Sequence, residues 1–486
     1  MDPHPSTAGL AGLGIGELSS RYQTGELDAT TVVEGLLERI AAVDAPGSGV
    51  ELRAIAAVSS DALEQARRLD AERAARGPRG PLHGVPVLVK DNIEVAGLPG
   101  AAGSSALVGR PCGDAALVTR LREAGCVILG STNLSAWANI RSSRSTSGWS
   151  ATGGLVGNPW ALDRSAGGSS SGAGASLAAG FTPFAVGTET DGSIVCPASL
   201  NGVVGLKPTV GTVPTGGIVP ISSSQDSPGP MVRSARDLSL ALSVLAGRTI
   251  QPTTEPLRWA ASQFAGTGHP GTDAAFEQAV SDLTSAGLVI ERRFLVPTPG
   301  SILDDALTVL LAELSDDLSA YLAARGGEGP RNLEELVRFG EAHREVELPY
   351  FGQEFFERAV TLGGRAGPAY EPARSRSLEW AQTVFLGPAL DDVDVLVAPA
   401  YGPAWKSDLT LSGHWSPTGG QITTAPAIAG WPIASVPLGL VDGLPVGMAI
   451  VARPGREDLL LGAALTVEQA LGGPLPPPAW RPPQRG

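Results

Sequence analysis

Five consecutive apolar residues, Val85–Val89, separate a glycine-rich turn from the polar residues Lys90, Asp91 and Asn92. A short apolar run that is rich in β-branched side chains and bounded by turn residues is typical of a buried β-strand. In α/β proteins, the ends of such strands carry the reactive groups. The run therefore predicts an α/β fold in which Lys90 lies at a functional edge of the sheet.

The sequence around this run alternates helix and strand patterns. Apolar residues recur at helical spacing within 32–40, and a second helix is expected over Ala62–Arg73. Asp114 is the predicted N-cap of a helix that Gly125 closes, and Cys126–Leu129 is the next predicted strand. This strand–helix–strand unit supports the α/β assignment.

The C-terminal half changes the order of the elements. Between 251 and 391 the pattern is that of amphipathic helices, and we expect a helical elaboration that covers the functional site. Strands return after 391, among them a hairpin about Asp442 and Gly443. Because the 486 residues show no break in composition, one domain over 1–486 with a single mixed sheet is predicted.

The charge pattern excludes several classes of protein. The chain carries 35 Lys plus Arg against 49 Asp plus Glu, a net charge of −14, so no basic surface for nucleic acid is expected. Residues 1–14 do not resemble a signal peptide, and no stretch approaches the roughly 18 apolar residues of a membrane span. We expect a cytoplasmic protein with no membrane or nucleic-acid partner, although an exported protein whose signal had been removed would show the same sequence.

Lysines are scarce, and their scarcity singles out Lys90. The only lysines are Lys90, Lys207 and Lys406, although the chain contains many arginines. A buried lysine can lose its proton and act as a base, whereas arginine cannot. Lys207 and Lys406 are interpreted as residues whose apolar stems lie on the protein while their charges reach water. The three cysteines show no C-x-x-C spacing, so neither a disulfide framework nor a metal site is predicted.

Two glycine- and serine-rich turns follow, Gly167–Gly172 (Gly-Gly-Ser-Ser-Ser-Gly) and Gly187–Ser193 (Gly-Thr-Glu-Thr-Asp-Gly-Ser). Glycines let the backbone approach a ligand and direct successive N–H groups toward one point, as acyl transfer requires around a developing oxyanion. Either turn alone is more typical of a flexible or phosphate-facing loop, but no Gly-Lys-Ser or Gly-Lys-Thr follows. The two turns therefore carry weight only in combination with Lys90.

This combination resembles the amidase-signature family. Ser193 lies 24 residues after Ser169, Lys90 stands at a strand end, and the resemblance runs from about Gly80 to Asp237 before it resumes in the C-terminal strands. Within the family, the chain resembles most the bacterial peptide amidases, which release ammonia from C-terminal peptide amides. The segments that carry this likeness are 144–150 (Arg-Ser-Thr-Ser-Gly-Trp-Ser), 188–191, 194–197 and 348–353 (Leu-Pro-Tyr-Phe-Gly-Gln).

The resemblance implies a fold and a set of catalytic roles. The fold would be an α/β/α sandwich with one large mixed central β-sheet covered by helices. Ser193 would be the nucleophile, Ser169, after a cis peptide bond, the proton relay, and Lys90 the base, with no cofactor and no metal. The backbone N–H groups of the run Thr190, Asp191, Gly192 and Ser193 would form the oxyanion hole. Ser170 would support the site by hydrogen bonding to Lys90 or to the relay.

The chain departs from the family at two positions next to the nucleophile. Many members have arginine where this chain has Val195, and glycine where it has Asp191. Contacts that those groups make elsewhere in the family cannot be assumed, so substrate recognition is open. Candidate substrate contacts are Asp226, Trp149 and Phe351, but Asp226 is equally well interpreted as a carboxylate that caps its own turn, and aromatic residues are more often part of a core.

Three alternative functions remain open from the sequence. The first is an amidase of small aliphatic or aryl amides, and the second is a non-catalytic protein or the amidase subunit of a complex. The third is an α/β-hydrolase, because 168–172 also fits G-x-S-x-G with Ser170 as the nucleophile. That fold needs a strand directly before the serine, and Leu162–Ala166 is not predicted to be one. A peptide or small-molecule amide is the expected partner, and both a monomer and a homodimer are possible.

Overall fold

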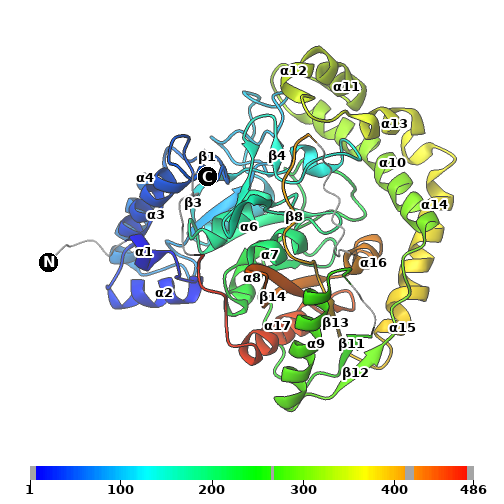
Figure 1. Cartoon of the computed structure of the whole chain (residues 1–486). Helices are drawn as coiled ribbons and strands as arrows, with labels where there is room; N and C mark the ends of the chain where they lie inside the picture. Colours follow the sequence, from blue (N-terminus) through cyan, green and yellow to red (C-terminus); the bar gives the residue numbers. More distant parts are fainter. Residues whose placement is uncertain (1–6, 264–266, 411–420, 479–486) are drawn as a thin grey trace.

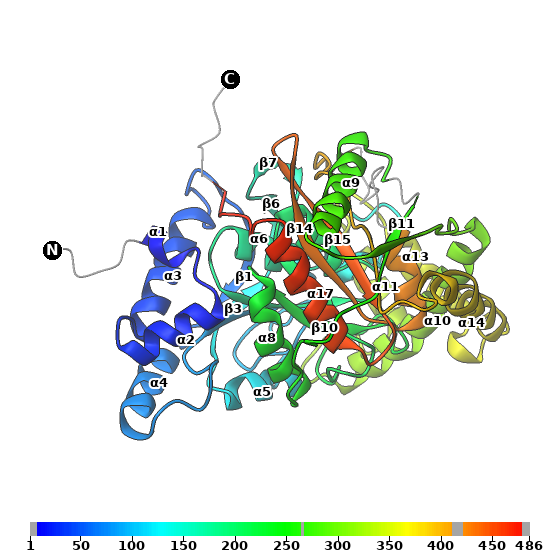
Figure 2. The ribbon, with the colours of Figure 1, turned by 90° about the horizontal axis from the view of Figure 1, so that it is seen from below.

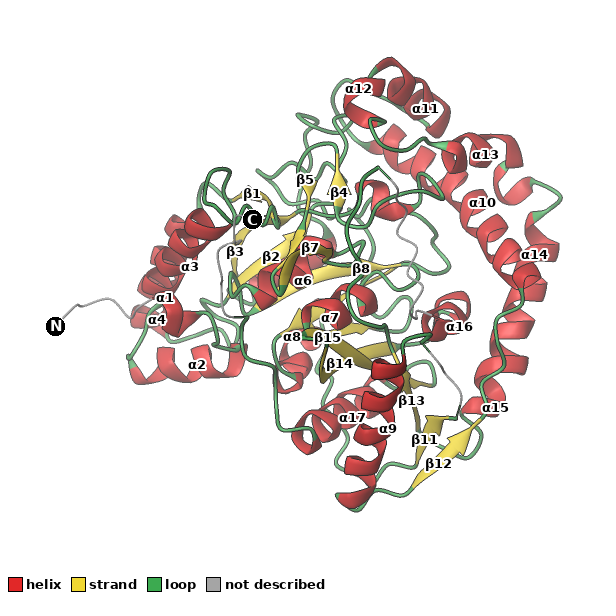
Figure 3. Cartoon of the chain, viewed as in Figure 1, coloured by secondary structure: helices red, strands yellow, loops and turns green. Residues whose placement is uncertain are grey.

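One mixed β-sheet runs through the centre of the molecule (Figures 1 and 3). The computed structural model describes residues 7–263, 267–410 and 421–478. Within these ranges the sheet has 11 strands in the order β1-β3-β2-β8-β10-β9-β14-β15-β13-β11-β12. The strands are β1 (Ile55–Val58), β2 (Pro86–Lys90), β3 (Val127–Thr132), β8 (Phe184–Glu189), β9 (Val204–Lys207), β10 (Ser227–Val232), β11 (Trp259–Ser262), β12 (Ile290–Arg293), β13 (Val395–Pro399), β14 (Ile433–Val441) and β15 (Leu444–Ala452). The predicted α/β architecture with a single large mixed sheet is confirmed.

The strand that carries Lys90 occupies a protected place in this sheet. β2 lies between β3 and β8 and is parallel to both, and all five of its residues are buried. The carboxyl ends of these three strands therefore meet at one edge of the sheet. At the other half of the sheet, β14 and β15 form the predicted hairpin, and the positive φ angles of Asp442 (53°) and Gly443 (77°) provide its tight turn.

Helices cover both faces of the sheet (Figure 2). α6 (Ser171–Ala178) and α7 (Val195–Asn201) lie on one face, and α5 (Ala116–Glu123) and α8 (Leu238–Ala246) lie on the other. α7 packs closely because two strands present glycine to it: a Cβ on Gly205 would lie 2.9 Å from the Cβ of Ala198, and one on Gly447 would lie 3.0 Å from the Cβ of Ser199. The close packing holds the segment that follows Ser193 against the sheet.

The remaining elements complete the layers around the sheet. The other helices of this body are α1 (Thr7–Leu10), α2 (Ile15–Thr24), α3 (Ala29–Val43), α4 (Ala62–Arg76), α9 (Pro270–Ser285) and α17 (Glu457–Ala470), with the 3-10 turns Ala136–Asn139 and Ala235–Asp237. Two small sheets pair β4 (Trp149–Ser150) with β5 (Gly154–Leu155) and β6 (Gly157–Asn158) with β7 (Ala161–Ser165). Asp114 is not the N-cap of α5, because its carboxylate accepts the Ala96 N–H (2.9 Å) and pairs with Arg122 (2.8 Å).

A wall of helices stands at one side of the sheet and forms the outer arc in Figure 1. Its elements are α10 (Gly300–Ala324), α11 (Leu333–Ala342), α12 (Arg344–Glu347), α13 (Glu354–Leu362), the 3-10 turn Gly364–Ala366, α14 (Tyr370–Glu379), the π-helical turn Trp380–Leu386 and α15 (Gly387–Ala389). α16 (Gln421–Ala429) lies inside this arc (Figure 1). The segment 251–391 is less purely helical than predicted, because β11 and β12 join the central sheet and the wall begins at Gly300. Within the described ranges, no helix is long and apolar enough to cross a membrane.

Candidate active site

Lys90 ends β2 with its side chain completely buried. Its Nζ lies 2.7 Å from Ser169 Oγ, 2.8 Å from Thr188 Oγ1 and 3.2 Å from the Thr188 carbonyl oxygen. Burial lowers the pKa of Lys90 to about 7, against the opposing effect of the carboxylates of Asp226 and Glu189. A neutral amine has two N–H donors and one lone pair, so Nζ can donate to the two Thr188 oxygens while it accepts the Ser169 hydroxyl proton.

The serine turn before α6 lies directly against this amine. The Gly168–Ser169 peptide bond is cis, and Ser169 and Ser170 are both completely buried. Ser170 Oγ donates to the Thr188 carbonyl (3.1 Å) and accepts the Thr188 N–H (3.3 Å). Ser170 therefore contacts Thr188, which holds Lys90, and not Lys90 or Ser169 as expected. Its hydroxyl reaches both main-chain groups of one residue because α6 begins beside the end of β8.

Ser193 lies in the turn that connects β8 to α7, next to the relay serine. The Ser170 N–H donates to the Ser193 carbonyl oxygen at 3.1 Å, which brings the two serine turns together. The Glu189 carboxylate closes the turn by accepting the N–H groups of Ile194 (2.7 Å) and Val195 (2.9 Å). None of the main-chain N–H groups of residues 190–193 donates to an acceptor among the described residues. These N–H groups are therefore able to donate to a ligand.

Glycine is required at position 192 of this turn. Its φ of 75° is in the left-handed region, and a Cβ there would lie 2.6 Å from the Tyr401 hydroxyl. The neighbouring Asp191 is held by α16, where Thr423 donates to its carboxylate at 2.6 Å and Thr424 at 3.1 Å. The carboxylate that distinguishes this chain from much of the family thus fastens the turn to α16.

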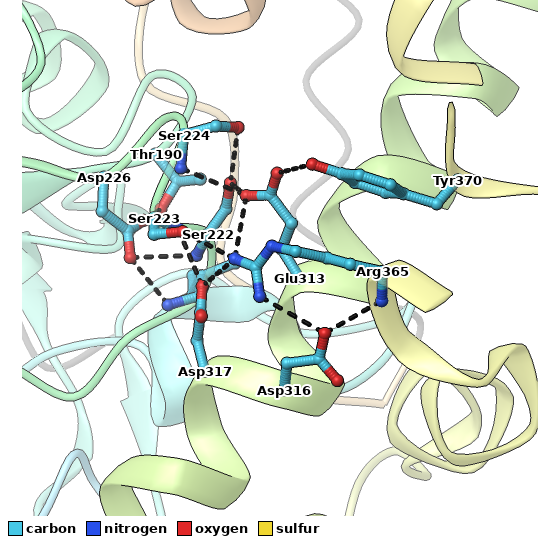
Figure 4. Close-up of polar contacts among 11 residues, drawn as sticks. Thr190, Ser222, Ser223, Ser224, Asp226, Glu313, Asp316, Asp317, Arg365 and Tyr370 are labelled. Atoms are coloured by element: carbon cyan, nitrogen blue, oxygen red, sulfur yellow. Dashed lines mark hydrogen bonds and ion pairs between the residues drawn. The ribbon is translucent and has the colours of Figure 1, made fainter. Parts of the chain in front are cut away.

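Asp226 and Thr190 meet on the opposite side of the turn (Figure 4). Thr190 Oγ1 donates to the Asp226 carboxylate at 2.6 Å, and the N–H groups of Ile221 (2.8 Å) and Ser222 (3.0 Å) donate to its other oxygen. The expectation that Asp226 caps its own turn is met. Both residues, with Thr188, also line a pocket of about 310 Å³ whose outer wall includes Tyr321 of α10.

Trp149 and Phe351 are packed against each other inside the protein. Their rings are 5.2 Å apart at 80°, and the buried guanidinium of Arg141 lies 4.6 Å from the Phe351 ring and 5.6 Å from the Trp149 ring. Neither aromatic residue lines the 310 Å³ pocket. The two segments that resemble peptide amidases do meet here, but the aromatic faces surround a buried cation, with Glu347 3.6 Å from Arg141.

The α/β-hydrolase alternative fails on the position of Ser170, although its strand is present. β7 does precede the serine turn, contrary to the prediction, but among the described strands it pairs with β6 in a separate two-stranded sheet. Ser170 is completely buried and hydrogen bonded to the backbone of Thr188. A nucleophile elbow needs an exposed serine at the end of a central strand.

Comparison with known proteins identifies the family that this site belongs to. The Amidase family model matches residues 31–461. The chain belongs to the amidase-signature family. The native peptide amidase from Stenotrophomonas maltophilia is 41% identical, with a TM-score of 0.88 over 96% of this chain and 98% of its own. The peptide amidase PAM in complex with the competitive inhibitor chymostatin is also 41% identical, with a TM-score of 0.90 over 96% of this chain and 99% of its own.

A second group of relatives carries a different name. A glutamyl-tRNA(Gln) amidotransferase subunit from Salinispora arenicola (strain CNS-205) is 36% identical over 510 residues, which cover 97% of this chain and 99% of that protein. Both groups share the family, so this amidase is a hydrolase that acts on amides. In the described part of the amidase, no group of three His, Cys, Asp or Glu side chains is arranged to hold a metal ion.

Several residues of the amidase site were not singled out from the sequence. Thr188 and Glu189 lie within the quoted Gly187–Ser193 turn, and Asn92, whose Nδ2 donates to Thr188 Oγ1 at 3.0 Å, follows Lys90 closely. Their place beside catalytic candidates was the available signal. Thr423 lies 232 residues from its partner Asp191, and no motif in the sequence connects the two.

Proposed function

We propose that this amidase releases ammonia from C-terminal peptide amides through a Ser193–Ser169–Lys90 triad and an acyl-enzyme intermediate. The observation that carries the chemistry is the 2.7 Å contact between Lys90 Nζ and Ser169 Oγ at full burial, beside the turn that holds Ser193. A lysine whose pKa is lowered to about 7 is partly neutral at neutral pH and able to take up a proton.

Acylation begins when Ser193 Oγ attacks the amide carbonyl carbon. The Ser193 proton moves to Ser169 Oγ as the Ser169 proton moves to Lys90 Nζ, so the amine becomes an ammonium and the substrate oxygen becomes an oxyanion. The free N–H groups of residues 190–193 donate to this oxyanion. The proton then returns through Ser169 to the leaving nitrogen, the C–N bond breaks, and ammonia departs from the ester on Ser193.

Deacylation repeats the same proton path with water. A water molecule attacks the ester carbonyl while Ser169 accepts its proton and passes its own to Lys90. The oxyanion forms again at the same N–H groups, and the ester C–O bond breaks as Ser193 recovers its proton. The products are a free carboxylic acid and the regenerated enzyme.

The substrate class rests on the relatives. Two peptide amidase structures are 41% identical over 96% of the chain, against 36% for the amidotransferase subunit. The contact between Trp149 and Phe351 joins the two segments that resemble peptide amidases. The amidotransferase relatives support a second candidate, a subunit that functions within a complex.

Covalent labelling tests the nucleophile. We expect a fluorophosphonate probe to label the wild type and Ser170→Ala, while Ser193→Ala is not labelled, because the probe reacts with an activated serine hydroxyl. Ser170→Ala is the matched control, since it removes a hydroxyl from the neighbouring buried turn. Loss of labelling in Ser170→Ala together with normal labelling of Ser193→Ala would make Ser170 the nucleophile.

Ammonia release by the chain alone tests the substrate. The panel contains a blocked dipeptide amide, the same peptide with an internal peptide bond in place of the amide, and propionamide. Rapid release from the dipeptide amide with little internal cleavage is the expected result. Preference for propionamide or for an aryl anilide would contradict the peptide assignment. Labelling at Ser193 without turnover of any amide would favour the role within a complex.

A further inference from the structure

We propose that Asp226 is a positioning residue, which fixes the oxyanion turn through the Thr190 hydroxyl and is itself held in place by the helical wall. This inference rests on the proposed function, because it assigns a role to the turn that would stabilise the oxyanion. Figure 4 shows the chain of contacts that runs from Thr190 through Asp226 and the turn Ser222–Asp226, here called the anchor turn, to α10.

The first link restrains one end of the oxyanion turn. Thr190 is the first residue after β8, and its hydroxyl donates to Asp226 at 2.6 Å. Threonine has one χ angle, so a hydrogen bond to its hydroxyl also limits the orientation of the main chain to which it is attached. The Thr190 N–H, the first of the free donors, is thereby directed. Asp191 is restrained separately by Thr423, so the two sides of the turn have independent supports.

The Asp226 carboxylate is committed to protein groups. One oxygen accepts from Thr190, and the other accepts the N–H groups of Ile221 and Ser222. These three donors orient the carboxylate toward Thr190. Direct recognition of a substrate N–H would have to compete with them, so a role through Thr190 explains the geometry better.

The second link fixes the anchor turn to α10. Glu313, completely buried on α10, accepts the Ser222 hydroxyl at 2.5 Å and the Ser224 N–H at 3.1 Å. Its other oxygen accepts the Tyr370 hydroxyl at 2.7 Å. An acidic side chain that is buried with this many donors holds its partners in one arrangement, because any movement leaves a buried carboxylate without hydrogen bonds.

A third link, nearer the surface, repeats the contact. Asp317, one turn after Glu313, accepts the Ser223 N–H at 2.9 Å, and Arg365 binds Asp317 at 2.7 Å and the Ser223 hydroxyl at 2.6 Å. Three consecutive serines of the anchor turn thus contact the helical wall (Figure 4). The wall acts on the oxyanion turn through this path as well as covering one side of the site.

The N-terminal helices offer a matched control for the Thr190–Asp226 pair. There the Thr30 hydroxyl donates to Asp70 at 2.6 Å, and Asp70 also accepts two main-chain N–H groups, those of Ala29 and Thr30, at 2.9 Å each. The two pairs have the same chemistry and the same hydroxyl-to-carboxylate distance. The Thr30 pair joins α3 to α4 and has no contact with the catalytic residues.

The test compares Thr190→Val, Thr190→Ser and Thr30→Val on the blocked dipeptide amide, with rates expressed per serine labelled by the fluorophosphonate. We expect Thr190→Val to lower kcat on the order of ten- to hundred-fold with KM changed less than about two-fold, because misplaced donors weaken transition-state binding. Thr190→Ser, which keeps the hydroxyl, stays well above Thr190→Val. Thr30→Val lowers Tm but keeps the wild-type kcat. Equal kcat in Thr190→Val and Thr30→Val would overturn the inference.

A double-mutant cycle tests whether Asp226 acts through Thr190. Asp226→Asn and the double variant Asp226→Asn/Thr190→Val are expected to lose no more of kcat than Thr190→Val alone, because all three break one link. Additive losses, or a rise in KM with kcat unchanged, would overturn the inference and make Asp226 a substrate contact. If Asp226→Asn does not fold, the Thr190 series decides alone. A wild type that labels but turns over no amide contradicts the proposed function, and the labelling rates of the same variants still test the positioning role.

Discussion

Lys90 and Lys207 end two strands of the same sheet, and both are completely buried. Burial lowers the pKa of Lys90 to about 7 and that of Lys207 to about 8. Their contacts differ, because Lys90 Nζ faces the Ser169 hydroxyl, whereas Lys207 Nζ donates to the Trp431 carbonyl at 2.8 Å and lies 3.5 Å from the Pro208 carbonyl oxygen. Carbonyl oxygens have no proton to give. Burial alone therefore prepares a lysine to be neutral, and only a neighbour that can lose a proton makes it a base.

The prediction that Lys207 places its charge in water was wrong. Its stem lies within the sheet, and the carboxylates of Glu189, Asp191 and Glu457 favour its charged form against the cost of burial. Lys207 is thus a buried cation that satisfies the Trp431 carbonyl near the base of the catalytic turn. The two lysines make a natural pair for experiments that separate a catalytic role from a structural one.

The largest expected effect separates the two lysines by turnover. Lys90→Arg should lower kcat about 10²- to 10⁴-fold, nearly as much as Lys90→Ala, because a guanidinium cannot accept the relayed proton. Lys207→Met should keep kcat within about ten-fold of the wild type, as expected if Lys207 transfers no proton. Steady-state ammonia release measures both. Near-normal turnover in Lys90→Arg would mean that Lys90 contributes only charge and packing.

The pH dependence should distinguish them next. Because the pKa of Lys90 is lowered to about 7, the amine is protonated below that pH and unable to act as a base. Activity, measured as kcat/KM, should therefore fall about ten-fold per pH unit on the acid side of 7 and level off above it. Lys207→Met should keep this limb. A limb that moves or disappears in Lys207→Met would show that Lys207, and not Lys90, is the group that titrates.

A smaller effect is expected at the hydroxyl that supports Lys90. Thr188→Val removes an oxygen that accepts from Lys90 Nζ, which disfavours the ammonium, so the acid limb should move to lower pH by up to about one unit. Thr182→Val is the control, because Thr182 is a buried threonine just before β8 whose hydroxyl donates to the Pro86 and Phe184 carbonyls. An equal shift in both variants would contradict a specific role for Thr188.

The smallest effect on rate accompanies a measurable effect on stability. Lys207→Met leaves the buried Trp431 carbonyl without its 2.8 Å donor, so the free energy of unfolding should fall by about 1–3 kcal/mol. Denaturant titration measures this change at neutral pH. Unchanged stability would mean that the Trp431 carbonyl finds another donor, and the contrast between a catalytic and a structural lysine would lose its second half.

Local patterns in the sequence determined the elements and the identity of the catalytic candidates. The apolar run at 85–89 became β2, the helix expected at Glu354–Leu362 has those bounds, and the hairpin turns at Asp442. Burial of an apolar stripe and the preference of Asp-Gly for positive φ act over a few residues, so they can be read without the fold. The lysine and the two serines were found because each stands in a distinctive local motif.

Tertiary structure alone decided what those residues touch. Ser170 contacts Thr188 in place of Lys90, Trp149 and Phe351 surround Arg141, and β11 and β12 leave the helical wall for the sheet. The supports of the oxyanion turn join residues that are far apart in the chain, as with Glu313 and Ser222 or Thr423 and Asp191. A hydrogen bond of this kind depends on how whole layers pack, because its two partners approach within about 3 Å only after the sheet and the helical wall have come together.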